Sequence, residues 1–284
     1  MAKRMVTLPD GTILPAIGQG TWLIGENPSK RKQEISTLRL GVELGMTVID
    51  TAEMYGEGST EELVGDGIKD IRDQVFLISK VYPHNAGGAS ITRSCEQSLK
   101  RLKTDRLDLY LLHWRGRVPL SETVEGMERL VEAGKIRRWG VSNLDTADMK
   151  ELFGIAKGGN CIINQVLYHL GSRGIEVDLL PWQKAHSIPI MAYSPLAQAG
   201  ALRRELVDDP VVKDIAAQLC ISPFQLLLAW CIQNDDVLAI PKASTEEHVR
   251  QNAAVSEIDF TQNDLNRLDA VFPKPSRKVP LDII

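Results

Sequence analysis

The chain has 284 residues, of which 43% are hydrophobic and 25% are charged, and its formal net charge is −4. This composition is ordinary for a globular protein, and the mildly acidic balance gives no sign of nucleic-acid or membrane binding. No apolar run approaches the ~18 residues of a membrane helix, and the basic start at residues 1–4 is not followed by an apolar stretch long enough for a signal peptide. We therefore expect a cytoplasmic protein, and one domain over residues 1–284, since an α/β barrel reaches this length as a single domain.

The predicted elements begin with a β-hairpin, in which residues 5–8 and 12–14 are separated by a Pro-Asp-Gly turn. Beyond it, short apolar runs alternate with helical stretches. Strands are expected near residues 16–20, 47–51, 75–80, 107–113, 136–142, 161–166, 188–193 and 237–241. Helices are expected near residues 30–44, 59–68, 90–102, 121–134, 145–157, 177–186 and 210–232, with two more after the last strand. This alternation predicts parallel strands joined by crossover helices, and eight units favour a closed barrel over an open sheet.

Three helix starts carry local signals. Ser59 with Glu62 fits a capping box, and Asp145 fits an N-cap. Ser222 followed by Pro223 fits an N-cap with proline at the first helical position. These signals support the helical stretches that the alternation predicts.

The four cysteines, Cys95, Cys161, Cys220 and Cys231, show no Cys-x-x-Cys spacing and fall within predicted helices or a strand. This pattern predicts buried, unpaired thiols of a cytosolic protein. It does not predict a metal site.

Polar residues close three successive predicted strands, because Asp50, Lys80 and His113 each end a short apolar run, and Tyr55 follows Asp50 closely. Taken singly, these residues could be a turn cap, a solvated strand end, a core histidine and a loop aromatic. Together, polar side chains at the carboxyl ends of neighbouring barrel strands indicate catalysis. A buried Lys80 beside Asp50 would stay charged, and a nearby cation favours the phenolate form. We therefore expect the pKa of Tyr55 to be lowered from about 10, which would make it a general acid.

Eight short motifs follow one another along the chain. They are Gly18-Gln-Gly-Thr-Trp22, Asp50-Thr-Ala-Glu-Met-Tyr55, Lys80-Val-Tyr-Pro83, Leu112-His-Trp114, Gly140-Val-Ser-Asn143, Ile163-Asn-Gln165, Ala192-Tyr-Ser-Pro-Leu196 and Ile240-Pro-Lys242, with Asn252 downstream. Through these motifs the chain resembles the aldo-keto reductase family over essentially its whole length, and in particular the bacterial reductases of small aldehydes and dicarbonyls. The resemblance implies a (β/α)8 TIM barrel whose N-terminal β-hairpin caps the barrel bottom.

The resemblance also implies a role for each residue of the tetrad. Tyr55 donates the proton to a carbonyl oxygen, while hydride arrives from a nicotinamide. Lys80, held by Asp50, depresses the tyrosine pKa, and His113 orients the carbonyl. A Rossmann half is not expected, because Leu23 stands where the third glycine of a dinucleotide fingerprint would be needed.

The cofactor implied by the resemblance is NADPH. Ser142, Asn143 and Gln165 would hold the carboxamide, Tyr193 would stack on the nicotinamide, and Lys242 would meet the 2′-phosphate. Ser194-Pro-Leu196 and the following Gln198-Ala-Gly200 would lie along the diphosphate. The whole implied set is Gly20, Thr21, Trp22, Asp50, Ser142, Asn143, Gln165, Tyr193, Ser194, Pro195, Leu196, Lys242, Ser244, Thr245, His248, Gln251 and Asn252.

Two positions depart from the family pattern. Ala243 replaces a common serine, and His248 replaces a common arginine that stacks on adenine and pairs with the phosphate. Histidine is a smaller, titrating substitute for a fixed, bidentate guanidinium. We therefore expect NADPH to be preferred, with weaker discrimination against NADH than an arginine would give.

The substrate pocket implied by the motifs has aromatic walls around one polar corner, which suits a small carbonyl with an apolar body. Its residues are Trp22, Tyr55, Tyr82, His113 and Trp114. The C-terminal tail is short, has no aromatic residue beyond Phe272, and offers little to enclose a large substrate. These features favour an aldehyde or α-dicarbonyl such as methylglyoxal over a steroid. A short tail in this family also implies a monomer.

Two other functions stay open. One is a non-catalytic, nucleotide-binding accessory subunit of the same fold, although the tyrosine, lysine and histidine are all present. The other is a metal-dependent hydrolase, which needs several histidine and carboxylate ligands around the metal. Only His113 closes a predicted strand, whereas the other histidines, His84, His169, His186 and His248, fall in predicted loops or helices.

Overall fold

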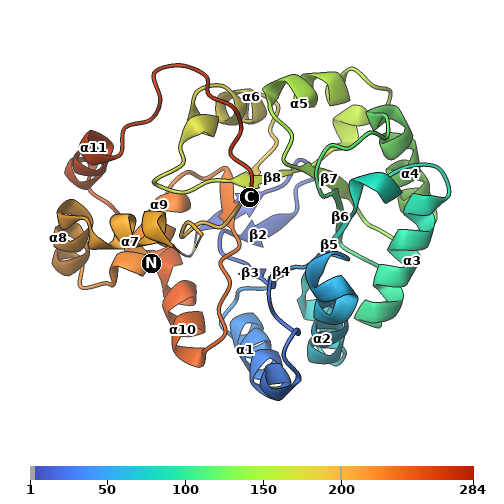
Figure 1. Ribbon diagram of the computed structural model, residues 1–284, viewed down its shortest axis with the longest axis horizontal. Coiled ribbons are helices and arrows are strands. Elements are labelled where there is room, and N and C mark those ends of the chain that lie inside the picture. The colour runs from blue at the N-terminus through green and yellow to red at the C-terminus, as the bar shows by residue number, and fades with distance from the viewer. Residues whose placement is uncertain (1–3, 199) are drawn as a thin grey trace.

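The computed structural model describes residues 4–198 and 200–284. Within these residues, eight parallel strands form one sheet in the order β10-β9-β8-β7-β6-β5-β4-β3, and helices surround it (Figure 1). The strands are β1 (Met5–Thr7), β2 (Ile13–Pro15), β3 (Gln19–Gly20), β4 (Val48–Asp50), β5 (Phe76–Val81), β6 (Leu109–Leu112), β7 (Trp139–Ser142), β8 (Asn164–Leu167), β9 (Ile190–Tyr193) and β10 (Val237–Ala239). The helices are α1 (Arg31–Glu43), α2 (Ser59–Ile68), α3 (Ser90–Leu102), α4 (Leu120–Glu132), α5 (Thr146–Phe153), α6 (Leu179–Ala185), α7 (Ala201–Asp208), α8 (Pro210–Gln218), α9 (Pro223–Cys231), α10 (Glu246–Ala254) and α11 (Gln262–Val271).

The sheet closes into a barrel because the first and last strands meet. Ile17 forms a parallel bridge with Ala239, and Gly18 N–H donates to the Ala239 carbonyl at 2.8 Å. Glycine is required at position 20 of this seam, because a Cβ there would lie 2.5 Å from the carbonyl oxygen of Ile240. The expected (β/α)8 barrel is confirmed.

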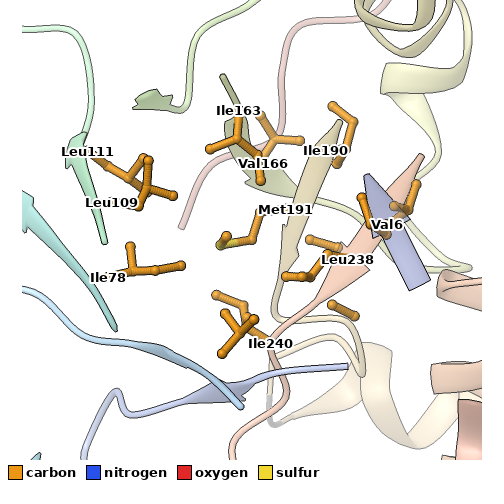
Figure 2. Close-up of a cluster of buried hydrophobic side chains, with 14 of the residues drawn as sticks. Val6, Ile78, Leu109, Leu111, Ile163, Val166, Ile190, Met191, Leu238 and Ile240 are labelled. Carbon is orange, nitrogen blue, oxygen red and sulfur yellow. The ribbon is translucent and has the colours of Figure 1, made fainter. Parts of the chain in front are cut away.

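Most residues of the eight barrel strands are buried on both faces of the sheet, which explains why these strands appear in the sequence as nearly continuous apolar runs. Ile78, Leu111 and Met191 point toward the middle of the barrel (Figure 2). The predicted hairpin is confirmed as the antiparallel pair β1–β2, and Val6, 1% exposed, lies beside Leu238 of β10. Asp10 of the hairpin turn pairs with Arg138, the residue before β7, so the hairpin packs against the barrel at its amino end.

The stretch predicted as one helix over residues 210–232 is two helices, α8 and α9, with a 91° bend between them. That prediction is wrong because proline disfavours a helical residue before it, and Ser222 is extended with φ −77° and ψ 155°. Ser222 then caps α9 in a capping box with Gln225, so the N-cap predicted there is confirmed. No single helix of the described ranges is long and apolar enough to cross a membrane; α8 and α9 pass that test only as a bent pair.

Other local predictions had mixed outcomes. Asp145 caps α5 as expected, in a capping box with Asp148. The capping box of Ser59 and Glu62 is wrong, because Ser59 is already the first residue of α2 and follows the left-handed Gly58, with φ 98°. Helix α7 was not predicted.

The cysteines are free, and three of them, Cys95, Cys161 and Cys231, are buried as expected. Cys220 is exposed, so the prediction of burial is wrong for it. Cys220 lies in the turn between α8 and α9 and has φ 56°, which takes it out of the packed helical layer.

Candidate active site

The candidate catalytic side chains stand at the carboxyl ends of strands, on the face that looks into the barrel. Side chains alternate along a strand, so a residue two positions after an inward one also points inward. Lys80 follows the inward Ile78 by two positions, and His113 follows Leu111 in the same way. Asp50 pairs in register with Ile78, and Lys80 pairs with Leu111. The strand pattern thus carries these polar groups to one rim.

The four side chains lie close together. Lys80 Nζ is 2.6 Å from Asp50 Oδ1, 2.9 Å from the Thr51 carbonyl oxygen and 3.0 Å from Tyr55 Oη. The rings of Tyr55 and His113 meet edge to face, with centroids 5.8 Å apart and planes at 74°. The structure therefore brings Asp50, Tyr55, Lys80 and His113 together.

Lys80 and Asp50 form a buried ion pair, in which the side chains are 0% and 2% exposed. Burial opposes the charge on Lys80, but Asp50 and Tyr55 outweigh it, so the pKa of Lys80 lies above its ordinary value. The expected lowering of the Tyr55 pKa is wrong. Burial raises the pKa of Tyr55, and the charge of Lys80 offsets only part of that rise. Tyr55 therefore keeps its proton at neutral pH, as a general acid must.

His113 is neutral in this environment. Burial, together with the charge of Lys80, lowers the pKa of His113 to about 2. Its Nδ1 is buried and finds no hydrogen-bond partner among the residues that the structure describes. A neutral imidazole has one N–H donor and one acceptor nitrogen, so His113 can offer a polar ligand either kind of hydrogen bond.

A second group of polar side chains continues the rim along β7, β8 and β9. Tyr193 Oη donates to Asn143 Oδ1 at 2.9 Å, and Ser142 Oγ donates to the Gln165 carbonyl at 2.9 Å. Gln165 Nε2 donates to Asp50 Oδ2 at 2.8 Å, which leaves Gln165 Oε1 as an acceptor. An amide acceptor, a hydroxyl and an aromatic ring beside the tetrad suit a carboxamide carried on a flat ring.

Comparison with known proteins assigns this geometry to a family. The sequence model of the family described as "Aldo/keto reductase family" matches residues 16–272 of the chain. The chain belongs to the aldo-keto reductase family.

Several relatives of this aldo-keto reductase are themselves named as reductases. It is 55% identical over 284 residues to methylglyoxal reductase YeaE of Escherichia coli (strain K12), covering 100% of both chains. It is 33% identical over 272 residues to glyoxal reductase of Bacillus subtilis (strain 168), covering 95% of this chain and 93% of the relative. A crystal structure of an aldo-keto reductase from Klebsiella pneumoniae in complex with NADPH matches with a TM-score of 0.98 at 56% identity, covering 100% of both chains. These relatives give no support to the accessory-subunit alternative.

The residues predicted to bind the adenosine end of a cofactor lie around the start of α10. Lys242 is exposed and forms no ion pair with the described part of the chain. Thr245 caps α10 by accepting from His248 N–H at 3.3 Å. The predicted residues on this loop and helix are Lys242, Ser244, Thr245, His248, Gln251 and Asn252. An unpaired ammonium on the loop that leads into the amino terminus of a helix suits a phosphate.

The predicted substrate residues form an aromatic wall next to the tetrad. The rings of Tyr82 and Trp114 meet edge to face, with centroids 6.0 Å apart, and the centroids of the Trp114 and His113 rings are 4.8 Å apart. On the β3 side, Thr21 Oγ1 donates to the Asp50 carbonyl at 2.8 Å, and Trp22 is 42% exposed on the following loop.

The end of the chain also reaches the site, which the sequence analysis did not anticipate. Lys278 pins the tail by pairing with Asp145 at 3.0 Å and with Asp178 at 2.8 Å. The backbone of Ile284 lies next to the Tyr193 hydroxyl, where it offsets part of the rise that burial causes in the pKa of Tyr193, and Figure 1 shows the C-terminus over the middle of the barrel. The tail therefore ends at the candidate site. The expectation that it offers little to enclose a large substrate stays a prediction.

Glu53 is another residue of the site that the sequence analysis missed. It is 9% exposed and accepts from Tyr82 N–H at 2.7 Å and from Asn85 Nδ2 at 3.4 Å. It thereby ties the loop that carries Tyr55 to the loop that carries Tyr82. The available signal was an acid placed between Asp50 and Tyr55 in one motif.

Within residues 4–198 and 200–284, no group of three or more His, Cys, Asp or Glu side chains could hold a metal ion. Two other histidines have contacts of their own. His169 Nδ1 accepts from Gly171 N–H at 3.1 Å, and His186 stacks on Trp182 with centroids 3.9 Å apart.

Proposed function

We propose that this aldo-keto reductase reduces small aldehydes, ketones and α-dicarbonyls such as methylglyoxal to alcohols with NADPH. The observation that carries the proposal is the 3.0 Å contact between Tyr55 Oη and the buried ammonium of Lys80. This contact gives a protonated phenol a fixed positive charge, which stabilises the phenolate once the proton has left. The reductases named among the relatives support the substrate class.

In the proposed mechanism, the substrate carbonyl oxygen lies between Tyr55 and His113. Tyr55 Oη donates its proton to that oxygen, and Lys80, held by Asp50, stabilises the tyrosinate that results. His113 is neutral, so a ring N–H can hydrogen-bond the same oxygen and orient the carbonyl. When bound, NADPH supplies the hydride that reduces the carbonyl carbon.

The side chains present fit the two ends of NADPH. Gln165 Oε1 and the Ser142 hydroxyl would bind the carboxamide, and the Tyr193 ring would stack on the nicotinamide. Lys242, on the loop that precedes α10, would meet the 2′-phosphate. With His248 in place of an arginine, the phosphate site depends chiefly on Lys242, so we propose a preference for NADPH with incomplete exclusion of NADH.

We further propose that the protein works as a monomer in the cytoplasm. This part of the proposal rests on the family resemblance and on the ion pairs by which Lys278, in the segment after α11, contacts Asp145 and Asp178 of its own barrel. Light scattering during size-exclusion chromatography tests it, because a mass of twice 31.5 kDa would contradict a monomer.

The test of the proposed function is NADPH oxidation with methylglyoxal, compared between the wild-type chain and Tyr55→Phe. Loss of the proton donor should lower turnover by at least about 100-fold. NADPH should still quench tryptophan fluorescence in the variant, because Tyr55 is not needed to hold the cofactor. Near-normal turnover by Tyr55→Phe, or faster turnover of a hydroxysteroid than of methylglyoxal by the wild type, would contradict the mechanism or the substrate class respectively.

A further inference from the structure

Arg203 lies in the first turn of α7 and contacts the loop that follows β9. Its Nε donates to the Leu196 carbonyl at 3.0 Å and to the Ala197 carbonyl at 3.1 Å, and its Nη2 donates to the Ala197 carbonyl at 2.5 Å. This loop begins at Ser194 and is the one that the family resemblance implies along the NADPH diphosphate. One guanidinium thus holds two successive carbonyls of a candidate cofactor loop.

The backbone of this loop is unusual for its sequence. Ser194 and Ala197 have φ values of 47° and 56°, in the left-handed region that non-glycine residues rarely adopt. Ala197 N–H donates to the Ser194 carbonyl at 2.9 Å and closes the turn. A turn with two such residues needs contacts from other parts of the chain to hold its conformation. Arg203 supplies them at the carboxyl end of the turn, at Leu196 and Ala197.

Arg203 is also unusual in its partners. It is partly buried, and among the described residues no Asp or Glu side chain pairs with it; burial accordingly lowers the pKa of Arg203. Its helix is anchored from the other side, because Leu202 and Leu206 lie against Gly171, where they would be 3.3 Å from an added Cβ. The Arg203 guanidinium thus donates to backbone carbonyls and to no described carboxylate. No described acidic side chain pairs with its positive charge.

We propose that Arg203 is a positioning residue for NADPH binding, an inference that rests on the proposed function. A trans peptide directs its N–H opposite to its C=O. Because Arg203 holds the Ala197 carbonyl toward α7, the N–H of Gln198 in the same peptide unit is directed away from α7. That N–H donates to the cofactor diphosphate, and Arg203 acts on the diphosphate through the turn.

The experiment measures binding to the cofactor-free full chain by titration calorimetry, with two ligands. One ligand is NADPH, and the other is adenosine 2′-monophosphate, which keeps the 2′-phosphate and lacks the diphosphate. The variants are Arg203→Met and Arg203→Lys. Arg204→Met is the matched control, because it removes the same charge from an exposed position on the same helix.

We expect Arg203→Met to weaken NADPH binding about tenfold, roughly the effect of losing one charged hydrogen bond, and to leave adenosine 2′-monophosphate binding unchanged. Arg203→Lys should fall short of wild-type affinity, because one ammonium does not reproduce the planar fork that spans both carbonyls. Arg204→Met should bind both ligands as the wild type does.

Several outcomes would overturn the inference while the proposed function stood. They are unchanged NADPH affinity in Arg203→Met, an equal loss in Arg204→Met, full affinity in Arg203→Lys, or a parallel loss of adenosine 2′-monophosphate binding. Failure of the wild-type chain to bind either ligand would overturn the proposed function itself. The two kinds of failure are therefore distinguishable.

Discussion

Gln165 Nε2 donates to Asp50 Oδ2 at 2.8 Å, although the two residues are 115 positions apart in the chain. The other carboxylate oxygen of Asp50 accepts from Lys80 Nζ at 2.6 Å. One buried carboxylate therefore joins the proton-transfer residues to the side chains proposed to hold the nicotinamide. A change at Asp50 should affect both.

Replacing Asp50 with asparagine should destabilise the fold, because it leaves the fully buried ammonium of Lys80 without its counter-charge. We expect a loss of about 3–5 kcal/mol in the free energy of unfolding, measured by urea denaturation. Asp259→Asn is the control, since it removes an exposed partner of Arg4 and should cost at most about 1 kcal/mol. Equal losses of unfolding free energy in the two variants would contradict the argument that the cost arises from burial of the Lys80 charge.

The pH dependence of carbonyl reduction should follow Tyr55. Burial raises the pKa of Tyr55 above its ordinary value of about 10, and the proton-donating form exists only below that pKa. The pKa of His113 is lowered to about 2, so His113 stays neutral across the working range. We therefore expect kcat/KM to be constant from about pH 6 to about pH 9 and to fall only above about pH 10. A decline centred near pH 7 would show that one of these groups titrates there.

Glu53 should matter for substrate binding more than for cofactor binding, because it holds the backbone of Tyr82. We expect Glu53→Ala to raise the KM for methylglyoxal about fivefold, the effect of one hydrogen bond of about 1 kcal/mol. Glu53→Gln keeps an acceptor oxygen and should restore most of the loss. An unchanged KM in Glu53→Ala, or an equal loss of NADPH affinity, would contradict this role.

The reactivity of the cysteines should separate one thiol from the rest. Cys220 is exposed, whereas burial raises the pKa of both Cys95 and Cys161 to about 12, and Cys231 is fully buried. Dithiobis(nitrobenzoate) should therefore titrate one thiol in the native protein, and all four cysteines of the chain after denaturation. Cys220→Ser should remove the native reaction; a fast thiol that remains would mean that a buried cysteine becomes accessible.

The barrel and the tetrad could be predicted because both depend on short-range patterns. An apolar run bounded by turn signals predicts a buried strand, and a polar residue at its carboxyl end falls at the rim that parallel strands share. Asp50, Lys80 and His113 satisfy both conditions, so their meeting required only the correct strand order.

Features that depend on distant contacts could not be predicted in the same way. The direction of the Tyr55 pKa shift is set by how far burial outweighs the charge of Lys80, and the sequence contains no measure of burial. Helix α7 is short and lies between residues 193 and 210, where the sequence pattern predicts neither a strand nor a helix. The tail lacks any regular pattern, and contacts with distant residues bring it back over the barrel. They include the ion pairs of Lys278 with Asp145 and Asp178 and the hydrogen bond that Ser172 Oγ donates to Asp282.

The position of the chain end decides how this protein can be handled in the laboratory. A purification tag or fusion partner attached after Ile284 would begin beside Tyr193, at the proposed nicotinamide site. Residues 4–15 lie at the opposite end of the barrel, where Arg4 donates to the Gln233 carbonyl ahead of β10 and Asp10 pairs with Arg138 ahead of β7. Assays should therefore be made with amino-terminal or cleaved tags, since a carboxyl-terminal fusion would obstruct the site whose activity is being measured.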